Sequence, residues 1–159
     1  SDTISALSKA PSLNTVMVHL DDYDDVLKDV GTPKFNIHRY SEKVGRKNQL
    51  SVLTLDILFK LGLKNSDNIS HRKLTSFLGQ IYKGYRRDVA YHNDLHGADV
   101  LEMSYVLMTE GNFINMAEMS ELDIISLVIA SVCHDYAHDG MTNAYHINAI
   151  SDRAIMFSD

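Results

Sequence analysis

From Phe35 onward, apolar residues recur three and four positions apart, which is the repeat of a helix with one buried face. The clearest case follows Ser70, a favourable N-cap, where apolar positions step i, i+3, i+4, i+7, i+8 and i+11. These residues are Leu74, Phe77, Leu78, Ile81, Tyr82 and Tyr85. No segment shows the convincing period of two that a half-buried strand requires. The sequence therefore predicts an all-α fold.

Turn-forming and capping residues divide this region into separate predicted helices. Gly62 and Gly111 are expected stop residues, because glycine is favoured just after a helix ends. Ser120 is a second favourable N-cap, and Thr142 stands near the start of the last helix. The predicted helices cover residues 50–61, 71–85, 94–110, 121–134 and a stretch from about 142 to 157.

Two of these predicted helices carry expectations about the core. The helix that runs to His134 is apolar on most of its circumference, so we expect it to be central in the fold. The last helix has apolar residues at helical spacing, and we expect that face to point toward the core. Its core-facing residues would be Ile147, Ile150, Ala154 and Phe157.

The first 32 residues differ from the rest in pattern and in charge. They show no sustained period, and residues 1–30 carry six aspartates against two lysines. We therefore expect residues 1–32 to form an acidic arm or linker, with Asp21–Asp29 solvated and with possible docking to a larger assembly. Residues 33–159 then belong to one domain. The formal net charge is −6 without a basic stripe, which argues against nucleic-acid binding.

Cysteine content and hydropathy indicate where the protein works. Cys133 is the single cysteine, which excludes an intrachain disulfide framework and fits a reducing compartment. It lies in an apolar run, so we expect an inert, buried thiol. No secretory signal pattern and no bilayer-length apolar stretch are present. We therefore expect a cytoplasmic, intracellular protein whose segment here makes no membrane contact.

Two copies of His-x-x-x-His carry the chemistry of the sequence. One pair is His92 and His96, and the other is His134 and His138. Residues four apart on a helix share a face, so each pair is expected to aim two imidazoles at one point. Asp135 adds a hard oxygen ligand that could bridge two cations. The clustering predicts a metal-dependent hydrolytic site.

A structural zinc site is the simplest alternative for these residues. Structural zinc normally takes four closed ligands rich in cysteine, which a chain with one cysteine does not supply. Histidine and carboxylate ligands with positions left for water are typical of catalytic metal instead. The isolated His19, His38 and His71 have no partner at ligand spacing and are read as ordinary residues.

Both histidine segments resemble the hallmarks of the class I 3′,5′-cyclic nucleotide phosphodiesterases. Residues 91–100 match Tyr-His-Asn-x-x-His-Ala-x-Asp-Val except at Gly97, which should cost about 1 kcal/mol relative to alanine in a helix. Residues 134–143 match His-Asp-x-x-His-x-Gly-x-x-Asn in full. The resemblance extends over residues 35–159 and is nearest the calcium/calmodulin-stimulated branch of this signal-transduction family. We expect no calmodulin binding, because the N-terminal arm is acidic rather than basic.

The resemblance implies the metal ligands. His96, His134 and Asp135 match ligands of a tightly held metal, usually zinc. Asp135 would also bridge to a second divalent ion, magnesium or manganese. His138 matches a residue that reaches the waters of the second ion, and Asn143 a polar neighbour in the same pocket. The implied activity is hydrolysis of cAMP, cGMP or both to 5′-nucleoside monophosphates.

Further roles follow from the same resemblance. His92 matches the general acid that protonates the departing O3′, a task that suits an imidazolium near physiological pH. Tyr91 is expected to line the nucleotide pocket. Asp99 is expected to orient a neighbouring histidine from outside the ligand set.

Other parts of the family's catalytic domain have no counterpart within residues 1–159. These parts are a later aspartate ligand, the glutamine that holds the purine and the hydrophobic clamp around it. We therefore expect residues 33–159 to be the N-terminal half of the catalytic domain, with the remainder of that domain as partner and activity confined to the intact protein. Two alternatives stay open, namely an HD-type phosphohydrolase with another nucleotide substrate and a non-catalytic scaffold module.

Overall fold

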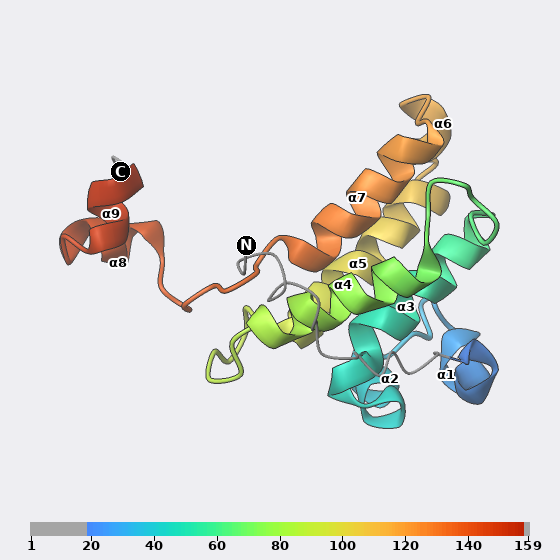
Figure 1. Cartoon of the computed structure of the whole chain (residues 1–159), viewed down its shortest axis with the longest axis horizontal. Coiled ribbons are helices and arrows are strands. Elements are labelled where there is room, and N and C mark those ends of the chain that lie inside the picture. Colours follow the sequence, from blue (N-terminus) through green and yellow to red (C-terminus); the bar gives the residue numbers. More distant parts are fainter. Residues whose placement is uncertain (1–18, 158–159) are drawn as a thin grey trace, which may run out of the picture.

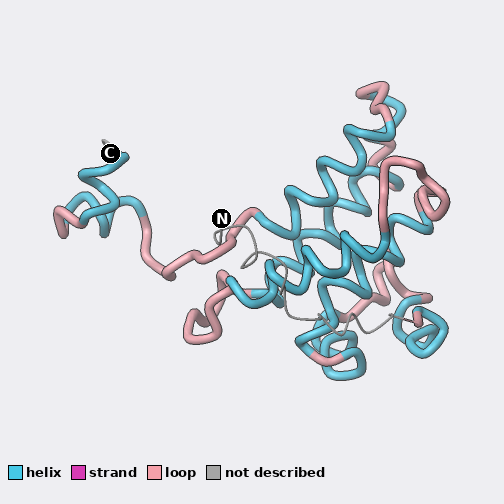
Figure 2. Tube along the Cα trace, in the orientation of Figure 1, coloured by secondary structure: helices cyan, strands magenta, loops and turns pink. Residues whose placement is uncertain are grey.

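The computed structural model describes residues 19–157, which form helices and connecting loops (Figures 1 and 2). A single 3₁₀ turn, Leu20–Tyr23, leads into α1, Asp24–Leu27. The larger helices are α2 (Ile37–Val44), α3 (Arg46–Lys60), α4 (His71–Gly84), α5 (Asp94–Thr109) and α7 (Glu121–Cys133). The short ones are α6 (Phe113–Met116), α8 (Asn143–Asn148) and α9 (Asp152–Phe157). Residues 19–157 contain no strand, so the all-α prediction is confirmed.

Local capping chemistry sets the helix boundaries near the predicted ones. Ser120 and Asp123 form a reciprocal capping box at the start of α7, in which each side chain accepts from the other's backbone N–H. The Asn93 side chain caps α5 by accepting from the backbone N–H groups of Leu95 and His96. Gly62 follows α3 with a φ of +81°, a conformation that glycine adopts without strain. Helices α4, α5 and α7 therefore begin and end within one residue of the predicted bounds, whereas α3 begins at Arg46, before the predicted start at residue 50.

The central helix is α3, which corrects the prediction that the helix before His134 is central. Every residue of α3 from Gln49 to Leu58 is buried, and the helix packs against α2, α4 and α5. By contrast, α7 packs one face against α5 and leaves Leu122 60% exposed on another. Polar residues hide the central position of α3 in the sequence. The Gln49 amide nitrogen donates to Asp94 Oδ2 at 2.5 Å, whereas Gln49 Oε1 and Thr54 Oγ1 are buried with no hydrogen-bond partner among the described residues.

The last predicted helix is broken, and its apolar face does not point to the core. Helices α8 and α9 are separate, and Ile150 between them has a φ of +47°. Ile147, Ile150 and Phe157 are 48%, 75% and 70% exposed, and of the predicted face Ala154 is the buried residue. Figure 1 shows α8 and α9 standing apart from the other helices. In this arrangement the face has no neighbour to cover it among residues 19–157.

Part of the predicted acidic arm packs onto the domain. Val26, Leu27 and Val30 are buried in the core, although the aspartates of the run Asp21–Asp29 lie mainly at the surface. The Lys60 ammonium donates to the Leu27 carbonyl at 2.6 Å and fixes this segment against α3. The expectation of a wholly solvated run is therefore wrong for these residues. The arm's residues 1–18 lie outside the described part of the chain.

Within residues 19–157, none of the helices has the length and apolar character needed to span a bilayer.

Candidate metal centre

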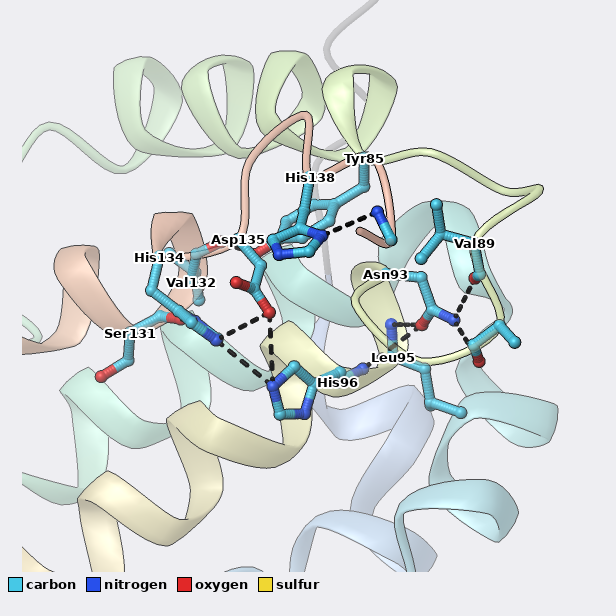
Figure 3. Close-up of polar contacts among 12 residues, drawn as sticks. Tyr85, Val89, Asn93, Leu95, His96, Ser131, Val132, His134, Asp135 and His138 are labelled. Atoms are coloured by element: carbon cyan, nitrogen blue, oxygen red, sulfur yellow. Dashed lines mark hydrogen bonds and ion pairs between the residues drawn. The ribbon is translucent and has the colours of Figure 1, made fainter. Parts of the chain in front are cut away.

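Helices α5 and α7 lie side by side and bring three ligand-type side chains together at one end (Figure 3). His96 comes from the first turn of α5, His134 from the C-cap of α7 and Asp135 from the turn that follows. The two Nε2 atoms are 3.3 Å apart. Asp135 Oδ2 lies 3.4 Å from His96 Nε2 and 3.2 Å from His134 Nε2. The structure thus brings together the three residues predicted as ligands.

The size of this triangle fits a divalent metal. Zinc binds imidazole nitrogen and carboxylate oxygen at about 2.0 to 2.2 Å, so neighbouring ligand atoms of a tetrahedral site lie about 3.3 Å apart. The three observed separations, 3.2 to 3.4 Å, match that edge length. Asp135 Oδ2 is also buried without a hydrogen-bond partner among the described residues, which is costly for a carboxylate unless a cation or water satisfies it. The cluster can therefore hold a divalent cation.

Both histidines have the protonation pattern that a ligand needs. His134 Nδ1 lies 2.8 Å from the Ser131 carbonyl oxygen, which only accepts, so Nδ1 carries the proton and Nε2 keeps its lone pair. Burial lowers the pKa of His96, and the neighbouring His134 lowers it further, whereas Asp135 acts in the opposite direction. His96 is therefore held neutral to lower pH than an ordinary histidine.

The two His-x-x-x-His pairs do not each occupy one helix, which corrects the sequence interpretation. His92 lies before the Asn93 cap of α5, and His138 lies in the loop after α7. The chain leaves the helical path beyond Cys133, and Ala137 takes a φ of +59°. Instead, each histidine pairs with a histidine of the other segment. His96 lies next to His134, and His92 stacks on His138. The ring centroids of the latter pair are 4.0 Å apart and their planes differ by 18°.

Tyr91 and Asp99 lie near His96, whereas Asn143 belongs to α8, which stands apart from the helices that carry the ligands. Tyr91 is 63% exposed, and its ring centroid is 4.4 Å from that of His96. Asn143 and His138 line a pocket of about 240 Å³ beside α8 and α9. Asp99 is exposed one turn after His96 on α5, and its negative charge slightly opposes the lowering of the pKa of that histidine by burial. Among the described residues no hydrogen bond joins Asp99 to a histidine, so its orienting role stays a prediction.

Sequence reasoning missed the groups that support the ligands. The Ser131 carbonyl fixes the tautomer of His134, and the Tyr85 hydroxyl donates to the Val132 carbonyl at 3.0 Å. Backbone carbonyls carry no residue signature, so the sequence could not reveal these partners. Gly97 was the one residue in the sequence that pointed to these supporting contacts. Its close contact with the Tyr85 side chain gives a structural reason for a glycine inside α5.

Comparisons with known proteins agree with this geometry. The family described as 3′5′-cyclic nucleotide phosphodiesterase matches residues 91–159. The chain is 32% identical over 85% of its length to the mouse dual specificity calcium/calmodulin-dependent 3′,5′-cyclic nucleotide phosphodiesterase 1C, and it covers 19% of that protein. It is 29% identical over 79% of its length to the 3′,5′-cyclic-nucleotide phosphodiesterase regA of Dictyostelium discoideum, and it covers 15% of that protein.

The chain therefore spans less than a fifth of the length of the curated relatives named above. The family match contains both histidine segments, from Tyr91 through His138, and thus every ligand of the candidate metal centre. Relatives from mouse and from Dictyostelium match a longer stretch, which extends beyond these segments. On these matches, the chain belongs to the 3′,5′-cyclic nucleotide phosphodiesterase family.

Proposed function

We propose that the intact protein hydrolyses 3′,5′-cyclic nucleotides to 5′-nucleoside monophosphates at a two-metal site. In this proposal, residues 33–159 are the N-terminal half of the catalytic domain, and the remainder of that domain supplies the missing ligand and the purine pocket. The observation that carries the proposal is the triangle of ligand atoms in His96, His134 and Asp135, with edges of 3.2 to 3.4 Å. The cytoplasmic location expected from the single cysteine is part of the same proposal.

The ligand set favours zinc as the metal held by His96, His134 and Asp135. Two imidazole nitrogens and one carboxylate oxygen are the donors that catalytic zinc sites use, with a further position left for water. Asp135 can offer its second oxygen to another cation, and oxygen ligands suit magnesium or manganese. When bound, two divalent ions acidify a water molecule and stabilise charge on the phosphate oxygens.

The chain's own residues would manage the proton and the nucleotide. Hydrolysis forms a bond from water oxygen to phosphorus and breaks the bond from phosphorus to O3′, which must gain a proton. We assign that proton to the His92 imidazolium, whose ring lies beside the centre and is held against His138. The exposed Tyr91 ring, next to His96, would line the nucleotide pocket. Asn143 would add a polar group beside His138.

A variant of the proton donor tests the proposal on the intact protein. His92→Ala should lower kcat by about a hundredfold or more, as expected for loss of a general acid, and should keep the bound zinc. His38→Ala is the matched control, because His38 is an exposed histidine on α2 and is not one of the three ligand residues. Hydrolysis of cAMP and cGMP and the zinc content are measured in parallel. Unchanged turnover of the His92 variant would remove this residue from the mechanism.

The same assays separate the alternatives. An HD-type phosphohydrolase would cleave deoxynucleotides and leave both cyclic nucleotides intact. A scaffold module would cleave neither, even when the intact protein is loaded with zinc and magnesium. The presence of all three ligands in working geometry favours the enzyme over the scaffold, because a module freed from catalysis has no reason to keep them aligned.

A further inference from the structure

Tyr85 stands at the end of α4, between the two helices that carry the metal ligands. It is the C-cap residue of α4 and is 3% exposed. Its hydroxyl donates to the Val132 carbonyl in the last turn of α7 at 3.0 Å. Figure 3 shows Tyr85 together with the ligand-bearing end of α7. The residue therefore belongs to a helix without ligands but contacts the ligand-bearing end of the domain.

The same side chain presses on α5 next to His96. A Cβ atom added at Gly97 would lie 2.9 Å from the Tyr85 hydroxyl oxygen and 3.2 Å from Cζ. Such distances are shorter than ordinary van der Waals contact, so the ring packs directly on the α5 backbone. Gly97 is buried and follows His96 directly. Tyr85 thus contacts α5 and α7 at once, each within two residues of a ligand.

The contact with α7 completes the hydrogen bonding of that helix terminus. The last carbonyls of a helix have no partner within the helix. The Ser131 carbonyl pairs with the His134 ring, and the Cys133 carbonyl accepts from the backbone N–H of Tyr136 at 2.9 Å. These two partners come from the turn itself. The partner of the Val132 carbonyl comes from α4, so Tyr85 ties the turn to the rest of the fold.

The hydroxyl keeps its proton under all ordinary conditions. Burial raises the pKa of Tyr85 to about 12. A protonated hydroxyl is a permanent donor to the Val132 carbonyl.

We propose that Tyr85 is a positioning residue that fixes the ligand-bearing ends of α5 and α7 at the separation a metal ion needs. The inference rests on the proposed metal site and deepens it. His96 and His134 sit on different helices, so their Nε2 separation of 3.3 Å depends on how the helix ends are held together. Loss of the Tyr85 hydroxyl leaves the ring in place and frees the end of α7. The ligand triangle then loosens, and zinc dissociates more readily.

The test removes one oxygen atom and measures zinc binding directly. In the intact protein, Tyr85→Phe should weaken zinc affinity about tenfold, the size of loss seen for groups that support metal ligands. Zinc affinity is measured by competition with a chromophoric chelator. The visible spectrum of bound Co²⁺, which reports ligand geometry, should change as well. Tyr82→Phe is the matched control, because the Tyr82 hydroxyl on the same helix accepts from the exposed Arg87 instead.

A second variant keeps the test decisive if Tyr85→Phe does not fold. Gly97→Leu, whose side chain is larger than the alanine of the family's hallmark, crowds the Tyr85 hydroxyl and should also weaken zinc binding. Its control is Gly79→Leu in α4, where an added Cβ meets no atom within 4 Å.

The His96→Ala variant separates failure of the Tyr85 inference from failure of the proposed metal site. If His96→Ala loses zinc while Tyr85→Phe binds it as the wild type does, with the same Co²⁺ spectrum, the positioning role of Tyr85 is overturned. If His96→Ala also binds zinc normally, the proposed metal site itself is wrong.

Discussion

The imidazole rings of His92 and His138 stack face to face, with centroids 4.0 Å apart and planes 18° from parallel. Neither histidine lies on a helix, and each comes from a loop that flanks a metal-ligand residue. The backbone N–H of Gly140 donates to His138 Nδ1 at 2.9 Å and fixes the orientation of that ring. His138 therefore serves as a support for the face of the proposed general acid.

The first prediction concerns this stack. His138→Ala in the intact protein should lower kcat by about tenfold or more, because His92 loses its supporting ring and its orientation toward O3′. Zinc content should stay at the wild-type level, since His138 is not in the ligand triangle. Steady-state hydrolysis and metal analysis on the same preparation check both parts. A variant with full kcat would show that the stack has no catalytic role.

The start of α7 offers a matched pair of stability variants. Ser120→Ala removes a cap that accepts from Asp123 N–H, and it should lower the free energy of unfolding by about 1 kcal/mol. Ser70→Ala at the start of α4 should cost less, because the Ser70 side chain makes no capping hydrogen bond. Urea denaturation of both variants measures the difference. If both variants lose the same free energy of unfolding, the Ser120 side chain does not stabilise α7 as a cap.

A buried carboxylate joins the N-terminal ends of α3 and α5. Asp94 is fully buried and accepts from Arg46 Nε at 3.1 Å and from Gln49 Nε2 at 2.5 Å. Arg46→Leu should cost about 2 to 3 kcal/mol of unfolding free energy, because the carboxylate loses a charged donor while buried. Arg86→Leu is the control, since its partner Asp88 is exposed and a surface ion pair contributes little to stability. If both arginines cost the same, the buried network is not a stability element.

The raised pKa of Tyr85 predicts a pH dependence at the alkaline end. Its pKa is about 12 in the folded protein against 10.0 for an unperturbed tyrosine side chain, so the folded state binds the proton more tightly between these values. Stability from this group is therefore complete below pH 10 and is lost as pH rises toward 12. Tyr85→Phe should show a shallower loss of unfolding free energy over that window than the wild type. Denaturant titrations at several pH values give the two slopes, and identical slopes would contradict the assignment.

Much of the fold follows from the sequence because its helices are amphipathic and capped. The Ser120 cap, the stop at Gly62 and the apolar period after Ser70 are local signals, and the structure places α3, α4 and α7 accordingly. The position of a helix within the fold is not local. Buried polar residues such as Gln49 made α3 look less central than it is, and the Gln49 amide nitrogen finds its partner, Asp94, on another helix.

The ligand set could be predicted because both histidine segments resemble the hallmarks of the phosphodiesterase family, while clustered histidines beside an aspartate indicated only that a metal site was present. The pairing of the four histidines could not be predicted, because His92 and His138 lie in turns that the helical period does not describe. The exposed face of α8 and α9 was unpredictable for a related reason. Residues such as Ile150 have helical spacing in the sequence, but a positive φ at that residue breaks the helix.

Anomalous diffraction at the zinc absorption edge, on crystals of the intact protein, tests the central claim most directly. The account predicts one strong peak within about 2.0 to 2.2 Å of His96 Nε2, His134 Nε2 and an Asp135 carboxylate oxygen. Zinc bound elsewhere, or no peak between these residues in a zinc-loaded crystal, would contradict it.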